Sequence, residues 1–288
     1  MANARRVQIA AQLLLAGGLI FVLLRLHSIW SDSHVSLARV HWLWLAGAFA
    51  LTASSVGASG FIWLVILRAL GVPTRSRWAG MFFQAQLGKY IPGGLWQYAG
   101  RSALARAYGI PMRAVATSLP IELAATACGG VAFCSLLLGW VGLIGVFVFL
   151  GVALLADAAT RSRRAALHAG ARASVLYGAV VWPLLSVGFW MTAHGFGRAS
   201  AADLPTYLGA FSAAWVVGLV AIYAPGGLGV REAVLVALLR GKIGSADALV
   251  VALASRAILT LVDLAAAGAG FTALRRGGRS LTAEAGSE

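Results

Sequence analysis

Two stretches of the chain combine a Pro-Gly-Gly break with charged side chains. The first runs from Gly88 to Arg101 (GKYIPGGLWQYAGR) and the second from Ala224 to Ala233 (APGGLGVREA). A helix that begins after such a break has backbone N–H groups without intrahelical partners, and these carry partial positive charge. Glycine lets a ligand approach the backbone closely, and a nearby Lys or Arg adds a full positive charge. The pattern therefore favours a site for an anion such as a phosphate.

The candidate residues for binding an anionic headgroup come from both stretches. They are Lys89, Tyr90, Pro92, Gly93, Gly94, Gln97, Arg101, Pro225, Gly226, Gly227, Gly229 and Arg231. An alternative for Lys89 and Arg101 is that their side chains extend to the membrane interface from a basic loop. An alternative for both breaks is an ordinary surface turn, although such a turn does not require the charges that accompany them.

Further charged residues fall in or near apolar segments. Three are acidic, namely Glu122, Glu232 and Asp263, and insertion of a bare charge there costs about 2.5–3.5 kcal/mol. Arg256 lies seven residues before Asp263, which places the two on one face of a helix. We expect Arg231 and Arg256 to pair with the three carboxylates. A structural ion cluster is one interpretation of this group, and charge balance or proton coupling at a binding site is the other.

Signatures of soluble enzymes are absent from the sequence. It contains no H-E-x-x-H, no G-x-S-x-G, no P-loop and no dinucleotide fingerprint. His27, His34 and His41 recur every seven residues, but they fall in a polar loop rather than on one predicted helix. We therefore predict no metal, no cofactor and no enzymatic activity, with an intramembrane enzyme acting on lipid headgroups as a third-ranked possibility.

The composition places these residues in a membrane. Of the 288 residues, 60% are hydrophobic and 11% are charged, whereas soluble domains have about 45–50% and about 25%. Apolar runs recur along the chain without strand-like alternation, which predicts helices rather than a barrel. The prediction is an all-α, polytopic protein of the inner or plasma membrane. The net charge of +14 is assigned to loops beside anionic lipid rather than to binding of nucleic acid.

The apolar runs predict about six full spans and two shorter, broken segments. The full spans are expected near residues 7–26, 42–67, 114–138, 140–156, 173–194 and 248–274. The broken segments, 78–87 and 207–224, run into the Pro-Gly-Gly breaks and are predicted to be re-entrant. Residues 1–275 are predicted to form a single transmembrane domain, followed by a short cytoplasmic tail at 276–288.

The basic residues divide unevenly between the two sides of this topology. Sixteen Lys and Arg residues fall on one side and five on the other, so the positive-inside rule places both termini in the cytoplasm. The two re-entrant segments then enter from opposite sides. Their hexapeptides Tyr90–Leu95 (YIPGGL) and Tyr223–Leu228 (YAPGGL) lie 133 positions apart and share five of six residues. This predicts an inverted repeat, which in transporters surrounds the substrate site.

The two blocks resemble those of the lysylphosphatidylglycerol synthase transmembrane-region family, the flippase-like domain. The resemblance extends over the span layout of residues 7–275, and its specific residues are the two blocks and Glu122. It implies re-entrant helices around a polar, lipid-accessible cavity, and a homodimer. Fused members carry an aminoacyl-transferase domain, whereas this chain ends about 14 residues after its last predicted span, so lysyl transfer is not expected. The family pattern also has a basic residue where Leu123 follows Glu122.

Two functions follow as expectations. The first is translocation of a membrane phospholipid or a lipid-linked precursor, with the headgroup held at the broken helices. The second is a non-transporting membrane partner that presents lipid to a separate glycosyl- or aminoacyl-transferase. In the first case Glu122, Glu232, Arg256 and Asp263 balance the charge of the site or couple it to protons.

Overall fold

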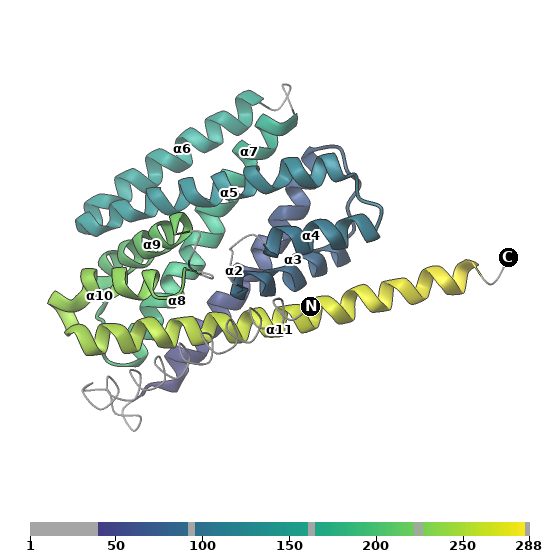
Figure 1. Ribbon diagram of the computed structural model, residues 1–288. Coiled ribbons are helices and arrows are strands. Elements are labelled where there is room, and N and C mark those ends of the chain that lie inside the picture. Colours follow the sequence, from purple (N-terminus) through teal and green to yellow (C-terminus); the bar gives the residue numbers. More distant parts are fainter. Residues whose placement is uncertain (1–39, 92–95, 161–164, 222–223, 225–226, 286–288) are drawn as a thin grey trace, which may run out of the picture.

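The computed structural model describes residues 40–91, 96–160, 165–221, 224 and 227–285, with side chains up to Arg275. Regular structure in these residues is helical throughout (Figure 1), which confirms the predicted all-α class. The predicted span at 7–26 and the candidate residues Pro92, Gly93, Gly94, Pro225 and Gly226 lie outside the described residues.

The described helices follow one another with short connections. The α-helices are α2 (Trp42–Ala69), α3 (Ala79–Gln86), α4 (Trp96–Ala107), α5 (Met112–Cys134), α6 (Leu143–Thr160), α7 (Ala165–Leu176), α8 (Trp182–Gly195), α9 (Leu204–Val220), α10 (Val230–Ile243) and α11 (Ser245–Ala285). Short 3₁₀ or π turns connect several of them, namely η2 (Ser76–Trp78), η3 (Leu87–Tyr90), η4 (Ser135–Gly142), η5 (Tyr177–Val181) and η6 (Ala201–Asp203).

Five described segments are long and apolar enough to cross a membrane, which indicates a multi-pass membrane protein. They are Trp42–Ala69, Met112–Ala159, Ala165–Gly195, Ala201–Val220 and Ser245–Arg275. The second contains the two spans predicted at 114–138 and 140–156, and three others contain one predicted full span each. Ala201–Val220 overlaps the segment that was predicted to be re-entrant from residue 207, and it begins earlier because η6 continues into α9.

The bend between α5 and α6 depends on a glycine. Gly139 within η4 has φ +73°, a conformation that other residues rarely adopt. The Ser135 hydroxyl lies 2.7 Å from the Gly142 carbonyl oxygen across this bend. The chain therefore turns back on itself, and the two predicted spans pack against each other as α5 and α6.

The predicted boundary of the span at 173–194 was wrong at its N-terminal side. The helix begins at Ala165 rather than near 173, so Arg172 lies on α7 instead of in a loop. The segment is rich in alanine, which has the highest helix propensity. A π turn at Tyr177–Val181 joins α7 to α8 and lies directly before the fully buried Trp182.

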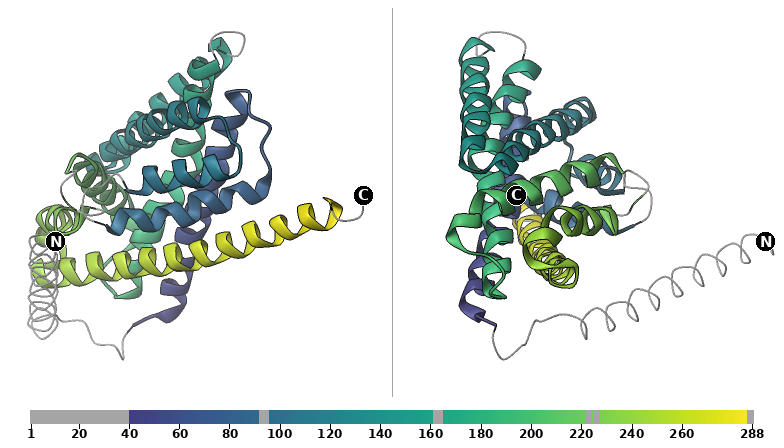
Figure 2. Two further views of the ribbon diagram at one scale, coloured as in Figure 1. Left: turned by 45° about the vertical axis from the view of Figure 1, so that its right-hand side comes forward. Right: turned by 90° about the vertical axis from the view of Figure 1, so that its left-hand side faces the viewer.

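Two helical pairs, the first formed by α3 and α4 and the second by α9 and α10, pack against the long helices α5 and α11. α3 packs against α4, and α9 packs against α10. In addition, α3 and α10 both pack against α11, while α4 and α9 both pack against α5 (Figures 1 and 2). The first pair approaches α11 through glycines, since a Cβ added at Gly80 would lie 2.7 Å from the Gly270 carbonyl oxygen. Small residues at such contacts are typical of helices in membranes.

The outer surface of α6 is apolar. Phe147 is 67% exposed and Leu155 is 72% exposed, and Ile144, Val148 and Val152 are exposed as well. Lipid tails are as apolar as these side chains, so a lipid-facing helix requires no polar outer face. Several buried charged residues, namely Arg101, Glu122, Glu232 and Asp263, instead lie on the helical pairs and on α5 and α11.

Candidate functional site

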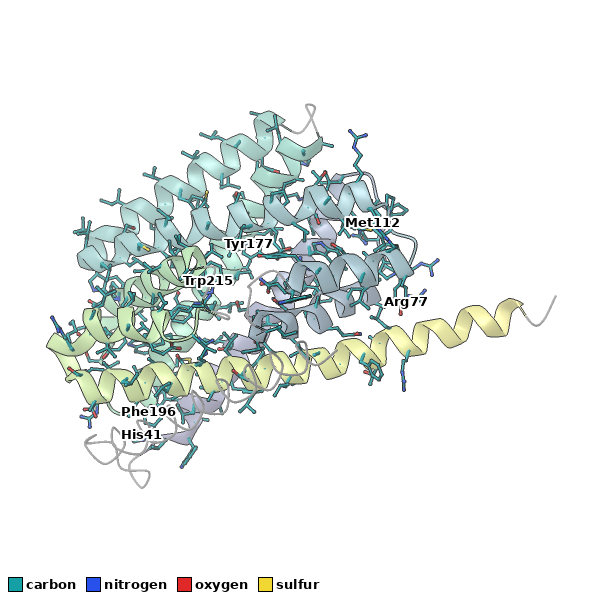
Figure 3. The ribbon with its side chains drawn as sticks, in the orientation of Figure 1. His41, Arg77, Met112, Tyr177, Phe196 and Trp215 are labelled. Carbon is teal, nitrogen blue, oxygen red and sulfur yellow. The ribbon has the colours of Figure 1, made fainter. Side chains whose placement is uncertain are left out.

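A cavity of about 290 Å³ is lined by residues from both helical pairs. Its wall includes side chains from α2, η3, α4, α5, η5, α9, α10 and α11. Tyr177 and Trp215, which are labelled in Figure 3, line it from η5 and from α9. Small-molecule sites typically occupy about 300–1,000 Å³, so this central cavity lies near the small end of that range.

The first break contributes a basic and an aromatic residue that both bind one carboxylate. Lys89 Nζ lies 2.6 Å from Asp263 Oδ2, and the Tyr90 hydroxyl donates to the same oxygen at 2.6 Å. Asp263 is completely buried, and its other oxygen, Oδ1, has no hydrogen-bond partner in the described part of the chain. The 3₁₀ turn η3 therefore attaches the first helical pair to α11.

An ion pair also attaches the second helical pair to α11, but here α11 supplies the cation and the helical pair supplies the carboxylate. Arg256 Nη1 on α11 donates to Glu232 Oε1 on α10 at 2.9 Å. The other oxygen of Glu232 accepts the Gly229 N–H at 2.7 Å, which satisfies one of the free N–H groups at the start of α10. Gly229 has φ +80°, so a glycine is required at this helix start.

A third ion pair is buried at the α4 side of the cavity. Arg101 on α4 binds Glu122 on α5 through both of its terminal nitrogens, with Nη2 at 3.4 Å from Oε1. The guanidinium lies over the Phe82 ring, 4.3 Å from its centroid. Arg101 is only 1% exposed, so the alternative of a side chain reaching to the interface is wrong for this residue. Although Leu123 follows Glu122, the carboxylate has an arginine partner from another helix.

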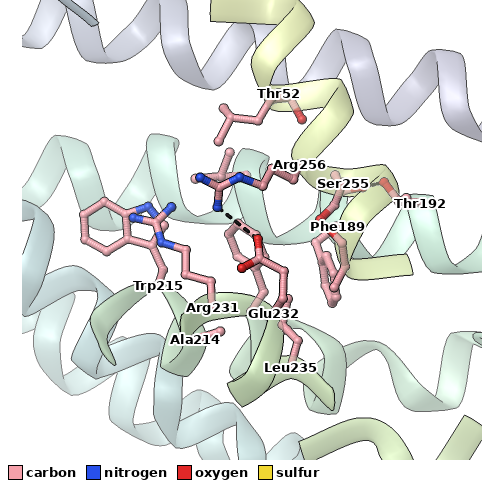
Figure 4. Close-up of a pocket in the computed structure, with 15 residues that line it drawn as sticks. Thr52, Phe189, Thr192, Ala214, Trp215, Arg231, Glu232, Leu235, Ser255 and Arg256 are labelled. Carbon is pink, nitrogen blue, oxygen red and sulfur yellow. Dashed lines mark hydrogen bonds and ion pairs between the residues drawn. The ribbon is translucent and has the colours of Figure 1, made fainter. Parts of the chain in front are cut away.

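Arg231 has no acidic partner among the described residues. The expectation that it pairs with one of the three carboxylates was therefore wrong, because each of them binds a different cation. Figure 4 shows its guanidinium beside Trp215, while Glu232 turns the other way towards Arg256. The guanidinium carbon lies 5.0 Å from the centroid of the Trp215 ring, and Nε is buried without a hydrogen-bond partner in the described chain.

Two glycines make room for the Arg231 side chain. A Cβ at Gly218 would lie 2.5 Å from Arg231 Cγ, and one at Gly227 would lie 2.8 Å from Arg231 Nε. Gly218 comes from α9 and Gly227 from the connection to α10, so the second Pro-Gly-Gly stretch forms a slot for this arginine. Arg231 also lines a smaller cavity of about 40 Å³, together with Glu232 and Arg256.

The structure brings together most of the described candidate residues. Those that line the central cavity are Lys89, Tyr90, Gln97, Arg101, Glu122, Gly227, Arg231 and Arg256. Glu232 lines the smaller cavity, and Asp263 lies behind Lys89 and Tyr90. Gly229 is the exception, because it starts α10 and is exposed rather than part of the cavity wall.

Sequence reasoning missed the aromatic part of the wall. Trp215 and Tyr177 line the cavity but were not among the candidate residues. Trp215 carried a usable signal, since it lies in the middle of an apolar run and not at its end, where interfacial tryptophans gather. Tyr177 offered no comparable signal, because its burial depends on the π turn between α7 and α8.

Comparison with known proteins adds nothing to this geometry: no family model, no curated protein and no solved structure matches the chain. Among the described residues, no group of three or more His, Cys, Asp or Glu side chains is placed to hold a metal ion.

Proposed function

We propose that this protein binds the anionic headgroup of a membrane lipid or lipid-linked precursor in the central cavity and moves it between the leaflets. The observation that carries the proposal is Arg231, a cation in the cavity wall that no carboxylate of the described chain neutralises. A charge inside a membrane protein is costly and typically marks a substrate pathway. A guanidinium can bind two oxygens of one phosphate through parallel hydrogen bonds.

The arrangement of helices supports an inverted repeat around this site. The chain can be divided into two halves with the same order of elements, a span, a helical pair and a second span. In the first half these are α2, α3–α4 and α5, and in the second half they are α8, α9–α10 and α11. α5 begins at Met112 and α11 at Ser245, 133 residues later, the same offset that relates the two Pro-Gly-Gly hexapeptides. α3 packs on α11 of the other half, as α9 packs on α5. We infer that both helical pairs are re-entrant, that they enter from opposite sides, and that both termini are cytoplasmic.

The ion pairs suggest how the halves hold the site. Lys89–Asp263 joins the first helical pair to the last span of the second half, whereas Arg256–Glu232 lies within the second half. Rocking of one half against the other would therefore strain the first pair more than the second. In transporters built from inverted repeats, such motion exposes a fixed midplane site to each side in turn. The resemblance to the flippase-like domain agrees with this proposal.

Lipid movement by the purified protein in liposomes tests the proposal. Fluorescent phosphatidylglycerol is expected to cross faster with the protein than without it. Arg231→Ala is expected to slow this movement about tenfold or more, because a charged hydrogen bond contributes about 1.5–3 kcal/mol. Arg240→Ala is the matched control, since Arg240 is exposed on the same helix and does not line the cavity. Absence of movement with every lipid class would overturn the translocator and leave lipid presentation to a partner enzyme.

A further inference from the structure

The charges around the central cavity can be counted among the described residues. Four cations line it, namely Lys89, Arg101, Arg231 and Arg256. Three carboxylates contact these cations, namely Glu122, Glu232 and Asp263. The neighbouring stretches 92–95 and 222–226 contain no Asp, Glu, Lys, Arg or His in the sequence, so they add nothing to this inventory.

The three carboxylates are distributed one to each of three cations. Asp263 binds Lys89, Glu122 binds Arg101 and Glu232 binds Arg256. Each pair is neutral as a unit, and only Arg231 is left over. The described wall therefore carries one excess positive charge. Because an unmatched charge in a low-dielectric site is costly, such a wall is best complemented by a ligand with one negative charge.

The surroundings of Arg231 are suited to binding two oxygens of one phosphate group. Its side chain is fixed between Gly218, Gly227 and the Trp215 ring, and its Nε has no partner in the described chain. A guanidinium presents its N–H donors as a planar fork that matches two phosphate oxygens. The rest of the wall includes uncharged hydrogen-bonding groups, such as Gln97 and Ser59, which suit hydroxyl groups rather than a second charge.

From this count we propose that the cavity selects a headgroup with a single net negative charge, that is, one phosphodiester and no cationic group, over a phosphomonoester, a diphosphate or a zwitterionic headgroup. The proposal rests on the proposed function, since it takes the ligand to be a lipid headgroup at this site. A second negative charge has no free cation in the described wall and would bind only by breaking a pair such as Lys89–Asp263. A zwitterionic headgroup could place its phosphodiester at Arg231, but its own cation would then be unmatched, because every carboxylate at the wall is already paired.

Competition binding tests this selectivity. The full-length purified protein is loaded with fluorescent short-chain phosphatidylglycerol and titrated with unlabelled phosphatidylglycerol, phosphatidic acid or phosphatidylcholine at about pH 8, where a phosphomonoester is mostly dianionic. Phosphatidylglycerol is expected to compete at least about tenfold better than the other two, because an unmatched buried charge costs more than one factor of ten. Equal competition by phosphatidylglycerol and phosphatidic acid would overturn the proposal.

Substitutions that change the excess charge of the cavity wall test the selectivity more directly. Asp263→Asn frees Lys89 and gives the wall two excess positive charges, so preference should move to phosphatidic acid by about tenfold. Arg231→Gln breaks no ion pair and removes the excess, so preference should move to phosphatidylcholine instead. Asp203→Asn is the matched control, because it removes a carboxylate from the exposed Lys242 pair and can still cap its helix. Unchanged preference in Arg231→Gln, with the fold intact, would overturn the charge rule.

The outcomes separate this inference from the proposed function. Failure of the wild-type protein to bind any of the lipid classes would overturn both, whereas binding of phosphatidic acid or phosphatidylcholine without phosphatidylglycerol would overturn only the inference. Binding and transport without any charge preference would leave the translocator standing and overturn only the inference. Soluble dimethyl phosphate, a monoanionic phosphodiester, is expected to compete better than inorganic phosphate at about pH 8, which would show that the phosphodiester group itself is recognised and not the acyl chains. The reverse order would overturn the inference.

Discussion

At the scale of single residues, the site depends on which cation binds which carboxylate. The sequence identified the charged residues because charges are rare in apolar segments, but it did not identify their partners. Lys89 and Asp263 are 174 positions apart, and Arg101 and Glu122 are 21 apart on different helices. Such pairing depends on how each helix is rotated and packed, and no local pattern records that. Arg231 is the clearest case, because only the structure shows that the three carboxylates bind other cations and leave it without an acidic partner among the described residues.

The buried Arg101–Glu122 pair should show the cost of an uncompensated charge. We expect Arg101→Met to lower the free energy of unfolding by about 3–5 kcal/mol, because Glu122 would stay buried without a partner. Lys242→Met, which breaks an exposed ion pair, should cost less than about 1 kcal/mol. The measurement is reversible unfolding of the purified protein in mixed detergent micelles.

The double variant Arg101→Met/Glu122→Leu distinguishes a charge effect from a packing effect. It should recover most of the lost stability, since replacing both members of a buried pair by apolar residues is often nearly neutral. A double variant that is no more stable than Arg101→Met would show instead that the packing of Arg101 on Phe82 and its other aromatic neighbours dominates.

At the scale of elements, the lengths of the apolar runs predicted the described spans well, and the irregular turns were missed. Runs of about 20 residues follow from membrane thickness, which is why α2, the α5–α6 pair and the membrane part of α11 lie close to their predicted bounds. The start of α7 and the π turn before Trp182 were not predicted, because they depend on packing against neighbouring helices. The two Pro-Gly-Gly stretches were found from composition alone, and they connect the helices that form the cavity.

The contact between α3 and α11 should depend on the missing side chain of Gly270. A Cβ there would lie 2.7 Å from the Gly80 carbonyl oxygen, so Gly270→Ala would push the two helices apart. We expect a loss of about 1–3 kcal/mol in the free energy of unfolding, as for other overpacked sites. Gly268→Ala on the same helix has open space around the new Cβ and should be neutral or stabilising by up to about 1 kcal/mol. Equal effects of the two changes would contradict the close contact.

At the scale of the whole molecule, one long helix joins both parts of the site. α11 is the long helix along the lower side of the ribbon in Figure 1. Its residues Arg256 and Asp263 bind the second and the first helical pair respectively. The two residues have opposite charges, and so do their partners. Arg231 lines the same cavity as Lys89 and Arg256, so a headgroup that bound there, as we propose, would lie near both attachments. Movement of α11 is the step that we expect to link the site to the two sides of the membrane.

The proposed inverted repeat makes a prediction about the side of the membrane on which two equivalent positions lie. Tyr108 follows α4 and Gly241 lies in the last turn of α10, 133 positions later, and both are exposed. In an inverted repeat such equivalent positions face opposite sides of the membrane.

In a background with Cys128→Ala and Cys134→Ala, an impermeant thiol reagent should label Gly241→Cys in intact cells but Tyr108→Cys only after the membrane is opened. Ser76→Cys should behave like Tyr108→Cys, and Ala201→Cys like Gly241→Cys, because their loops are predicted on those sides. Labelling of Tyr108→Cys and Gly241→Cys from the same side would rule out inversion, and with it the rocking of one half against the other.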